Sequence, residues 1–517
     1  MRIADYLDTA AGRYPDAEVL VFGAERVTYA QARELVHTIA NAFKAEKALS
    51  ENACVAVYSG NDHRISLVQW GANRADLVWM GVHVRNATAT NIEVLKYMDC
   101  EAIFFSSALE ADLPALKAGL PNVRLWVCID RESPHGVHLD AWMDGHEGEF
   151  PYTPCDANRV ACMVPSGGTT GPSKGAVHKH SSLEMEIVNL AMSMGIVEGS
   201  RLLTVAPLSH AAGQIALGFI PFGGVNVILS EFHPDEFLKT CNEERISHLF
   251  IPPTILYSLL LSPLAKTLDL SSLRCMFVGA APVAPQKFKE AVELFGPVVY
   301  EGYAQTETLI PVLVKSPTDY LLPDGSFDER VLRSSGRPPP LVRVAIMDDA
   351  GKLLPSGEAG EVVVRASMGM SGYYKLPDAT AEASQYGWHH TGDVGVMDAR
   401  GYVTLIDRKK DMVITGGFNV YPNEVEAVLN MHPSVLECIV IGVPDEKWGE
   451  AVKGIVRLKP GATATQAELI ALCREHLGGV KSPKTVEFWE DLPRSAVGKL
   501  LRREARQRFW AGHWRSI

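Results

Sequence analysis

Short runs of β-branched and aromatic residues, alternating with longer segments of helical periodicity, most constrain how this chain can fold. The main runs are ACVAVYSG, EAIFFSS, RLWVCID, LLTVAPLSH, HLFIPPT, RCMFVGAAP and PVVYEGYAQTE. Strands that alternate with helices predict an α/β fold with parallel, doubly wound sheets. In such sheets a ligand binds at the carboxyl ends of the strands. The polar, glycine-containing segments follow these strands, so we expect them to form one site.

The segment VPSGGTTGPSKG, residues 164–175, follows a short strand and has almost no side-chain bulk. In such a loop the backbone N–H groups can converge on an anion, and serine and threonine hydroxyls add donors. Its single cation, Lys174, favours a phosphate ligand over a plain flexible turn. The loop is not the P-loop G-x-x-x-x-G-K-[ST], because Ser173 precedes the lysine and Gly175 follows it.

The composition limits the class of protein. A chain of 517 residues is expected to hold more than one domain. The net charge of −12 argues against a nucleic-acid-binding protein, since no basic field is available to neutralise a phosphate backbone. Nine cysteines without a C-x-x-C pair predict reduced thiols and a cytoplasmic location. No apolar run approaches the length of a membrane span, so membrane insertion is not expected.

The texture of the sequence changes twice toward its C-terminal end. From about Ser334, short strands alternate with Pro- and Gly-rich turns, which predicts a small β-barrel over about 334–406. Near LIDRKKDMVITGG a strand leads into a charged cluster, and a small unit of helices and strands follows. We therefore expect an N-terminal domain over 1–406, made of two doubly wound α/β subdomains and the β-barrel. A small α+β domain is expected over 412–517.

Six motifs, in order along the chain, carry a resemblance to the adenylate-forming superfamily. They are SGGTTGPSKG, PLSH, GYAQTE, HTGD, DRKKDMVITGGFNVYPNEVE and PRSAVGK. Over nearly its whole length the chain resembles acyl-CoA and aryl-CoA synthetases, luciferases and the adenylation domains of peptide synthetases. The resemblance implies that a carboxylate attacks the α-phosphate of ATP, that pyrophosphate leaves, and that a thiol then attacks the acyl-AMP. In this reaction the protein has to position the reactants and stabilise charge.

The resemblance assigns the glycine-rich loop to the β- and γ-phosphates of ATP. The residues concerned are Ser166, Gly167, Gly168, Thr169, Thr170, Gly171 and Lys174. The hydroxyls and the lysine would donate hydrogen bonds, and the glycines would let the loop move out as pyrophosphate leaves. Gly167 stands where the family usually has serine, and Ser173 where it usually has proline. The SGGTTG variant also occurs in aryl-acid adenylating enzymes, which hints at an aromatic substrate.

The motif GYAQTE is implied to hold the metal. Glu307 is the expected Mg²⁺ ligand, and Thr306 beside it would contact the metal and phosphate. Tyr303 would lie against the adenine or the acyl group, with Glu301 and Gly302 as backbone neighbours.

The motif HTGD is implied to hold the ribose. Asp393 would accept both ribose hydroxyls, and Arg408 would reach the ribose and phosphate oxygens. His389 and His390 lack a partner cluster and are not expected to bind a metal.

The resemblance also implies a mobile C-terminal domain that turns about a hinge at 407–411, which includes Lys410. Lys499 of PRSAVGK would be the catalytic lysine, bridging the incoming carboxylate and the α-phosphate. Rotation would withdraw Lys499 and bring Gly416 and Gly417 to line the pantetheine tunnel, where any Cβ would obstruct a thin linear chain.

The sequence limits the class of carboxylic acid that the site could accept, but it does not name the acid. His210 of PLSH would stand at the mouth of the acyl pocket, as a further catalytic-site residue. Small residues would leave room for a ring or a long chain, and these are Ala211, Ala212, Gly213, Gly279, Ala280 and Ala281. Fatty and aromatic acids both remain open.

The expected function is an acid–CoA ligase that uses ATP, Mg²⁺ and coenzyme A. One alternative is an acyl-AMP ligase that loads a separate carrier protein, and another is a non-catalytic nucleotide-binding protein on the same fold. Homodimers are common in such families.

Overall fold

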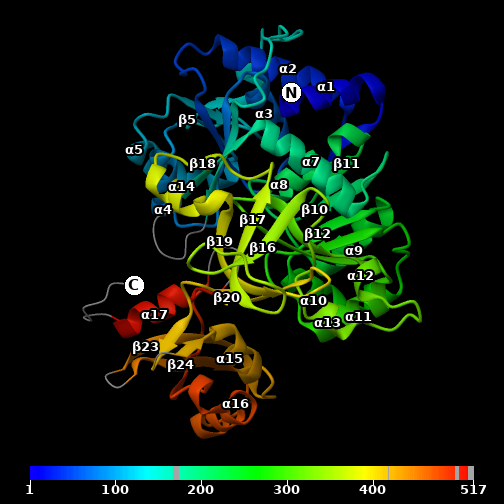
Figure 1. Ribbon diagram of the computed structural model, residues 1–517. Helices are drawn as coiled ribbons and strands as arrows, with labels where there is room; N and C mark the ends of the chain where they lie inside the picture. Colours follow the sequence, from blue (N-terminus) through cyan, green and yellow to red (C-terminus); the bar gives the residue numbers. More distant parts are fainter. Residues whose placement is uncertain (167–173, 417, 446–447, 495–499, 511–517) are drawn as a thin grey trace.

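The computed structural model describes residues 1–166, 174–416, 418–445, 448–494 and 500–510. Within these ranges the chain forms two eight-stranded sheets, a four-stranded sheet and a five-stranded sheet. The first three belong to the N-terminal part, drawn blue to yellow, and the last lies at one end of the molecule in orange and red (Figure 1). The predicted α/β fold, with a large N-terminal and a small C-terminal part, is confirmed.

The first eight-stranded sheet is parallel in its centre and antiparallel at both edges. From one edge to the other its strands are β15 (Leu309–Lys315), β14 (Val299–Gln305), β13 (Cys275–Val278), β12 (His248–Ile251), β10 (Arg201–Thr204), β11 (Val225–Ile228), β1 (Glu18–Phe22) and β2 (Glu25–Thr28). The order reverses beside β10, and such a switch point is where doubly wound sheets bind ligands.

The second eight-stranded sheet has antiparallel strands at one edge and parallel strands elsewhere. Its order is β18 (Gly372–Tyr373), β9 (Lys174–Lys179), β8 (Val160–Ser166), β4 (Val78–Gly81), β3 (Cys54–Tyr58), β5 (Cys100–Phe105), β6 (Leu125–Cys128) and β7 (Val137–His138). The edge strand β18 comes from a segment some two hundred residues further along the chain than its neighbour, so this edge joins distant parts of the sequence.

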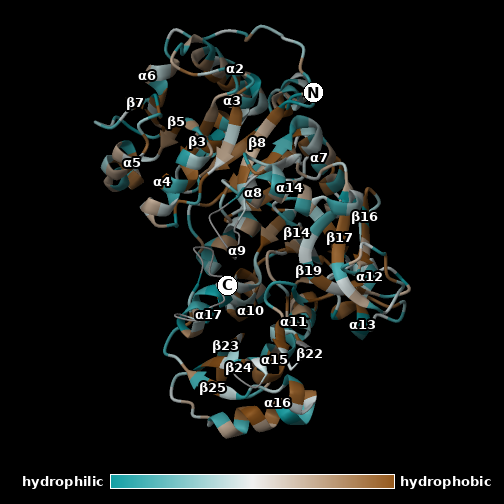
Figure 2. Ribbon diagram, turned by 60° about the vertical axis from the view of Figure 1, so that its left-hand side comes forward, coloured by the Kyte–Doolittle hydropathy of each residue, from teal (hydrophilic) through white to brown (hydrophobic). Residues whose placement is uncertain are grey.

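Helices cover both faces of each large sheet, because their apolar stripes pack on the apolar strands. One face of the first sheet carries α9 (Pro234–Glu243), α10 (Pro253–Leu261) and α11 (Pro285–Phe295), and the other carries α7 (His180–Met194) and α8 (Ala211–Leu217). The second sheet packs against α2 (Tyr29–Ala45) and α3 (His63–Arg74) on one face, and α4 (Thr88–Tyr97) and α5 (Leu113–Gly119) on the other. Figure 2 shows the apolar segments of β8 and β14 inside these layers.

The N-terminal part contains five further helices and four 3₁₀ turns within the described residues. They are α1 (Ile3–Arg13), α6 (Leu139–Met143), α12 (Pro317–Tyr320), α13 (Glu329–Leu332) and α14 (Pro377–Ala383), with 3₁₀ turns η1 (Ser107–Asp112), η2 (Ile220–Phe222), η3 (Pro263–Lys266) and η4 (Gln385–Gly387). The segment predicted as a small β-barrel forms the four-stranded antiparallel sheet β16 (Val342–Met347), β17 (Ala359–Ala366), β19 (His389–Met397) and β20 (Val403–Arg408).

The C-terminal part has its own sheet and core. Its strands are β21 (Val413–Thr415), β22 (Phe418–Val420), β23 (Val435–Asp445), β24 (Gly449–Leu458) and β25 (Thr485–Phe488). Helices α15 (Pro422–Leu429) and α16 (Gln466–Lys481) pack on one apolar cluster of this sheet, and α17 (Arg502–Trp510) packs on a second. The predicted hinge, residues 407–411, spans the last two residues of β20 and the turn that leads to β21.

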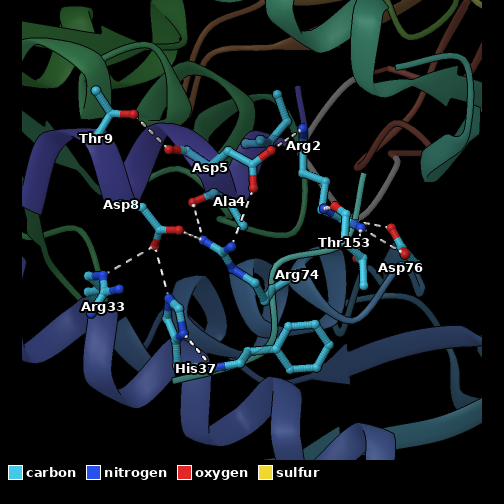
Figure 3. Close-up of polar contacts among 12 residues, drawn as sticks. Arg2, Ala4, Asp5, Asp8, Thr9, Arg33, His37, Arg74, Asp76 and Thr153 are labelled. Carbon is cyan, nitrogen blue, oxygen red and sulfur yellow. Dashed lines mark hydrogen bonds and ion pairs between the residues drawn. The ribbon is translucent and has the colours of Figure 1, made fainter. Parts of the chain in front are cut away.

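Buried ion pairs fix the N-terminal helix α1 to the second sheet's helices (Figure 3). Asp8 pairs with Arg74 and accepts a hydrogen bond from His37 Nε2 at 3.1 Å, while His37 Nδ1 accepts the Phe150 N–H. Arg2 is 1% exposed, and its Nε lies 2.7 Å from Asp76 Oδ1. Burial alone would raise the pKa of Asp76, but the Arg2 guanidinium lowers it below the usual value.

All nine cysteines are free, and eight of them are buried. None of the helices in the described ranges combines the length and the hydropathy that a membrane-spanning segment requires.

Candidate functional site

The carboxyl ends of strands in the two large sheets supply most of the predicted site residues. Ser166 is the last residue of β8, His210 follows β10, and Gly279 follows β13. Tyr303 lies near the end of β14, which pairs with β13. The parallel strands β10, β13 and β14 end on the same edge of the first sheet, whereas β8 belongs to the second. Tyr373 of the second sheet links the two, because it contacts both Lys174 and Glu307.

The two ends of the glycine-rich loop are held side by side. Ser166 and Lys174 are paired across the antiparallel strands β8 and β9, and Ser166 is buried. The ammonium of Lys174 lies 4.8 Å from the ring centroid of Tyr373. The loop residues between them, Gly167, Gly168, Thr169, Thr170 and Gly171, lie outside the described residues.

Glu307 and Thr306 occupy the turn between β14 and β15. Glu307 Oε1 accepts a hydrogen bond from the Tyr373 hydroxyl at 2.9 Å, and the Met370 N–H donates to the carbonyl of Glu307 at 2.7 Å. His178 Nε2 lies 2.9 Å from the Thr306 carbonyl oxygen. These contacts fix the turn from its two sides.

The donor set at Glu307 fits a magnesium ion. Mg²⁺ is usually bound by one or two carboxylates together with substrate phosphates and water. Within the described residues, Glu307 Oε2 accepts no hydrogen bond, so one oxygen of this carboxylate is available. The described part of the chain holds no cluster of three or more His, Cys, Asp or Glu side chains suited to a metal ion. An ion here would therefore need phosphate oxygens as further ligands.

Asp393 is the centre of a second group of polar contacts. Its Oδ2 accepts hydrogen bonds from the Tyr303 hydroxyl at 2.5 Å and from Gln305 Nε2 at 2.8 Å. Its Oδ1 lies 3.4 Å from Arg408 Nε, the residue opposite it in the β19–β20 ladder. Burial and the Asp393 charge raise the pKa of Tyr303 well above its usual value, so the phenol remains a donor.

The two adjacent histidines of HTGD have separate partners. His389 Nε2 lies 3.4 Å from Gln305 Oε1, and burial lowers its pKa. His390 Nδ1 lies 3.2 Å from Glu361 Oε2. The two rings therefore do not converge on a common point.

His210 directly precedes α8 and lies in a loop that the side chain of Asn61 holds in place. The side chain of Asn61 donates to the Val205 carbonyl at 3.1 Å and accepts the Leu208 N–H at 2.9 Å. The ring of His210 lies 4.7 Å from that of His83, centroid to centroid. Burial, together with the neighbouring His83, lowers the pKa of His210 to about 4, so the imidazole is neutral at pH 7.

His83 was not predicted from the sequence. It follows β4, where a Cβ on Gly81 would lie 1.9 Å from the Ser209 carbonyl oxygen. Beside His210, the end of β4 in the second large sheet therefore packs directly against the loop that follows β10 of the first. In the described chain both ring nitrogens of His83 and Nε2 of His210 are buried without a hydrogen-bond partner.

Several glycines of the predicted site lie close to packed neighbours. A Cβ on Gly302 would lie 2.0 Å from Phe277 Cζ, and a Cβ on Gly279 would lie 3.4 Å from Phe250 Cε2. A Cβ on Gly213 would lie 2.0 Å from the Leu208 carbonyl oxygen. Packed neighbours leave no space for a Cβ at Gly302 and Gly213. The expectation that the small residues leave room for the acid stays a prediction.

Ala280 and Glu301, two other residues of the predicted site, have a special backbone conformation and core contacts, respectively. Ala280 has a left-handed backbone, with φ of 69°. Glu301 forms a buried ion pair with Lys315 at 2.6 Å and accepts the Val283 N–H, so its carboxylate serves the core, as its expected role of backbone neighbour implies.

The C-terminal residues of the predicted site are only partly described. Gly416 has φ of +57°, and a Cβ there would lie 2.6 Å from Trp448 Cε3, so the close approach expected at this glycine is made by the chain itself. Lys410 lies between β20 and β21. Gly417 and Lys499 lie outside the described residues.

Comparison with known proteins decides the family. Residues 7–374 match the AMP-binding enzyme family, and residues 424–499 match the AMP-binding enzyme C-terminal domain. The chain belongs to the AMP-binding enzymes. It is therefore a member of the adenylate-forming superfamily, and the resemblance carried by the six motifs is confirmed.

Individual relatives of this AMP-binding enzyme differ in substrate. It is 32% identical to a medium/long-chain-fatty-acid–CoA ligase of Mycobacterium tuberculosis, over 98% of this chain and 90% of that protein. It is 32% identical to a feruloyl-CoA synthase of Amycolatopsis sp., over 96% of each. The solved structure of the amide bond synthetase McbA from Marinactinospora thermotolerans has a TM-score of 0.87 at 30% identity, covering 98% of this chain and 100% of that one.

Tyr373, Gln305 and His83 are the residues of this AMP-binding enzyme that sequence reasoning missed. Gln305 lies inside the GYAQTE motif, which could have drawn attention to it. Tyr373 lies in GYYK, where a glycine and aromatic pair was the available signal. For His83 the sequence gives no signal, because its partner lies in another sheet.

Proposed function

We propose that this AMP-binding enzyme is an ATP-dependent acid–CoA ligase. It activates a carboxylic acid as acyl-AMP with release of pyrophosphate. It then transfers the acyl group to the thiol of coenzyme A, giving acyl-CoA and AMP. The observation that carries the proposal is the pair of polar groups at one edge of the sheets. Asp393 with Tyr303 suits a nucleoside, and Glu307 with Lys174 suits a triphosphate and its metal.

In the first step the enzyme's own residues hold charge in place. Asp393 accepts ribose hydroxyls, and Lys174 and Ser166 bind phosphate oxygens at the ends of the glycine-rich loop. Glu307 and Thr306 would hold Mg²⁺, which supplies positive charge to the departing pyrophosphate when it is bound. Lys499 neutralises the charge that develops between the carboxylate and the α-phosphate.

For the second step we propose a rotation of the C-terminal domain about residues 407–411. This is supported by where the contacts of that domain lie. The Asn423 N–H donates to Asp407 Oδ2 at 2.7 Å, and Arg502 pairs with Asp407 at 3.1 Å and with Asp411 at 3.5 Å. These contacts sit at the pivot and can persist while the rest of the domain turns. The TGGFN turn with Gly416 and Gly417 would then reach the thiol path.

The acid is either fatty or aromatic, and the relatives support both classes equally at 32% identity. The buried, free thiols support a cytoplasmic location. The main alternative keeps the first step and passes the acyl group to a separate carrier protein.

The test is pyrophosphate release after the protein is mixed with ATP, Mg²⁺ and a panel of fatty, aryl and arylalkanoic acids. Release with one class is expected, and it names the substrate class. Free coenzyme A and a phosphopantetheinylated carrier protein are then compared as acceptors. No release with any acid of the panel would refute the ligase and favour a non-catalytic nucleotide-binding protein.

A further inference from the structure

Tyr373 touches the two oppositely charged residues at the triphosphate end of the site. Its hydroxyl donates to Glu307 Oε1 at 2.9 Å, and its ring centroid lies 4.8 Å from the Lys174 ammonium. Glu307 belongs to the turn after β14, and Lys174 begins β9 in the other large sheet. One side chain therefore contacts both charges across the junction of the two sheets.

The backbone of Tyr373 is held on both sides. Gly372 and Tyr373 form β18, which pairs with Val177 and Ala176 of β9. The Tyr373 N–H donates to Thr380 Oγ1 at 2.8 Å. Gly372 has φ of +151°, and a Cβ there would lie 2.7 Å from Thr380 Cγ2. This fixed backbone gives the ring one position relative to Lys174.

The contacts keep the two charges apart. A lysine and a glutamate that face one site gain by forming a direct ion pair. Within the described residues Lys174 and Glu307 do not pair, because the lysine lies over the aromatic face and the carboxylate accepts the phenol. Burial and the Glu307 charge raise the pKa of Tyr373, which keeps the phenol a donor.

We propose that Tyr373 is a positioning residue that holds Glu307 Oε1 and separates Glu307 from Lys174, so that both charges remain available to magnesium and the ATP phosphates. The inference rests on the proposed function, since it presumes that ATP and Mg²⁺ bind at this end of the site. With Oε1 taken by Tyr373, the second oxygen of Glu307 would be left to hold the metal.

Three variants test the proposal. Tyr373→Phe removes the hydroxyl and keeps the ring beneath Lys174. Tyr373→Leu removes both contacts. Tyr374→Phe is the matched control, because the neighbouring Tyr374 donates in the same way to a carboxylate, Asp99 Oδ2 at 2.6 Å, in another part of the molecule.

The measurement is ATP binding by calorimetry without any acid, so that no adenylate forms. The readout is the ratio of the ATP dissociation constants measured with a chelator and with excess Mg²⁺. Tyr373→Phe is expected to reduce this ratio about tenfold, which matches the loss of one hydrogen bond to a charged group, with metal-free binding unchanged. Tyr373→Leu is expected to weaken metal-free ATP binding as well, because Lys174 is then free to pair with Glu307. Tyr374→Phe should match the wild type.

The outcomes separate this inference from the proposed function. A ratio in Tyr373→Phe equal to that of the wild type would overturn the positioning role alone. Equal effects of Tyr373→Phe and Tyr374→Phe would overturn it too, since they would point to a general loosening of β18. Absence of ATP binding by the wild-type protein would refute the proposed function and this inference together. Thermal melting of each variant checks that the chain remains folded.

Discussion

Gly302 packs so closely on Phe277 that adding one methyl group, as in Gly302→Ala, is expected to change the shape of the site. An ideal Cβ on Gly302 would lie 2.0 Å from Phe277 Cζ and 2.3 Å from Cε1. Carbon atoms pack at about 3.5–4.0 Å, so the substitution Gly302→Ala requires a displacement of about 1.5 Å. Phe277 is 1% exposed and packs against Phe250, so its ring has no free space to move into. The strain therefore moves β14 itself.

The cost of this displacement falls on stability and on catalysis. Overpacking of a core costs about 1–3 kcal/mol. Tyr303 is the next residue of β14 and donates to Asp393, and a misplacement of about 1 Å at such a site can reduce the rate about 100-fold. We expect Gly302→Ala to lower kcat/KM for ATP by about that factor in a pyrophosphate-release assay, with a lower melting temperature.

Two further variants decide whether the clash is the cause. Phe277→Leu removes the ring atoms that the methyl group would meet, so the double variant should recover activity relative to Gly302→Ala alone. Gly369→Ala is the matched control near the site, because its Cβ would lie 3.4 Å from the Ala366 carbonyl oxygen and 4.0 Å from that of Glu307. Normal kinetics of Gly302→Ala, or a double variant no better than the single one, would refute the reasoning.

Three other expectations follow from charge and burial. Burial lowers the pKa of His178 and His248 to about 4, so the unfolded chain binds these protons first and the fold loses stability as the pH falls from 6.5 to about 4. The loss is about 3 kcal/mol for each histidine, from about 2.5 pKa units at 1.36 kcal/mol per unit. Thermal unfolding across this pH range should show the loss, and His248→Gln should reduce it. Asp76→Asn leaves the buried Arg2 charge without its partner and should destabilise the protein by about 3–5 kcal/mol in thermal or denaturant unfolding; an unchanged midpoint would contradict this. Lys499→Ala should reduce pyrophosphate release at least 100-fold while sparing thioester formation from supplied acyl-AMP, and equal loss of both steps would disprove the division of labour.

The positions of the site loops were predictable because they depend on strand order. Ser166 ends a buried strand of the second sheet, His210 and Gly279 follow buried parallel strands of the first, and parallel strands of one sheet end on the same edge. Alternation of strands and helices was enough to predict that these loops meet. The pairing of Ser166 with Lys174 follows from the short connection between β8 and β9.

The contacts of Tyr373 and His83 could not be predicted because they join elements that are distant in the sequence. β18 has only two residues, too few for a hydrophobic period, yet it places Tyr373 beside Lys174. His83 meets His210 only where Gly81 lets two backbones approach. The aromatic rings beside Gly279 and Gly302, Phe250 and Phe277, come from other strands, so these contacts could not be predicted from the sequence.

Under the proposed function, the carboxylate of Asp393 serves both the fold and the nucleotide. Its Oδ2 already accepts the Tyr303 hydroxyl and Gln305 Nε2, whereas Oδ1 has only Arg408 Nε beside it, at 3.4 Å. A carboxylate has about four lone-pair positions, so the two donors fill Oδ2 and leave Oδ1 to a ribose hydroxyl. Arg408 ends β20 and lies within the segment 407–411 proposed as the pivot. Under the proposed function, nucleotide binding and the position of the C-terminal domain depend on the same oxygen atom, and a rotation that moves Arg408 would change the charge beside the ribose.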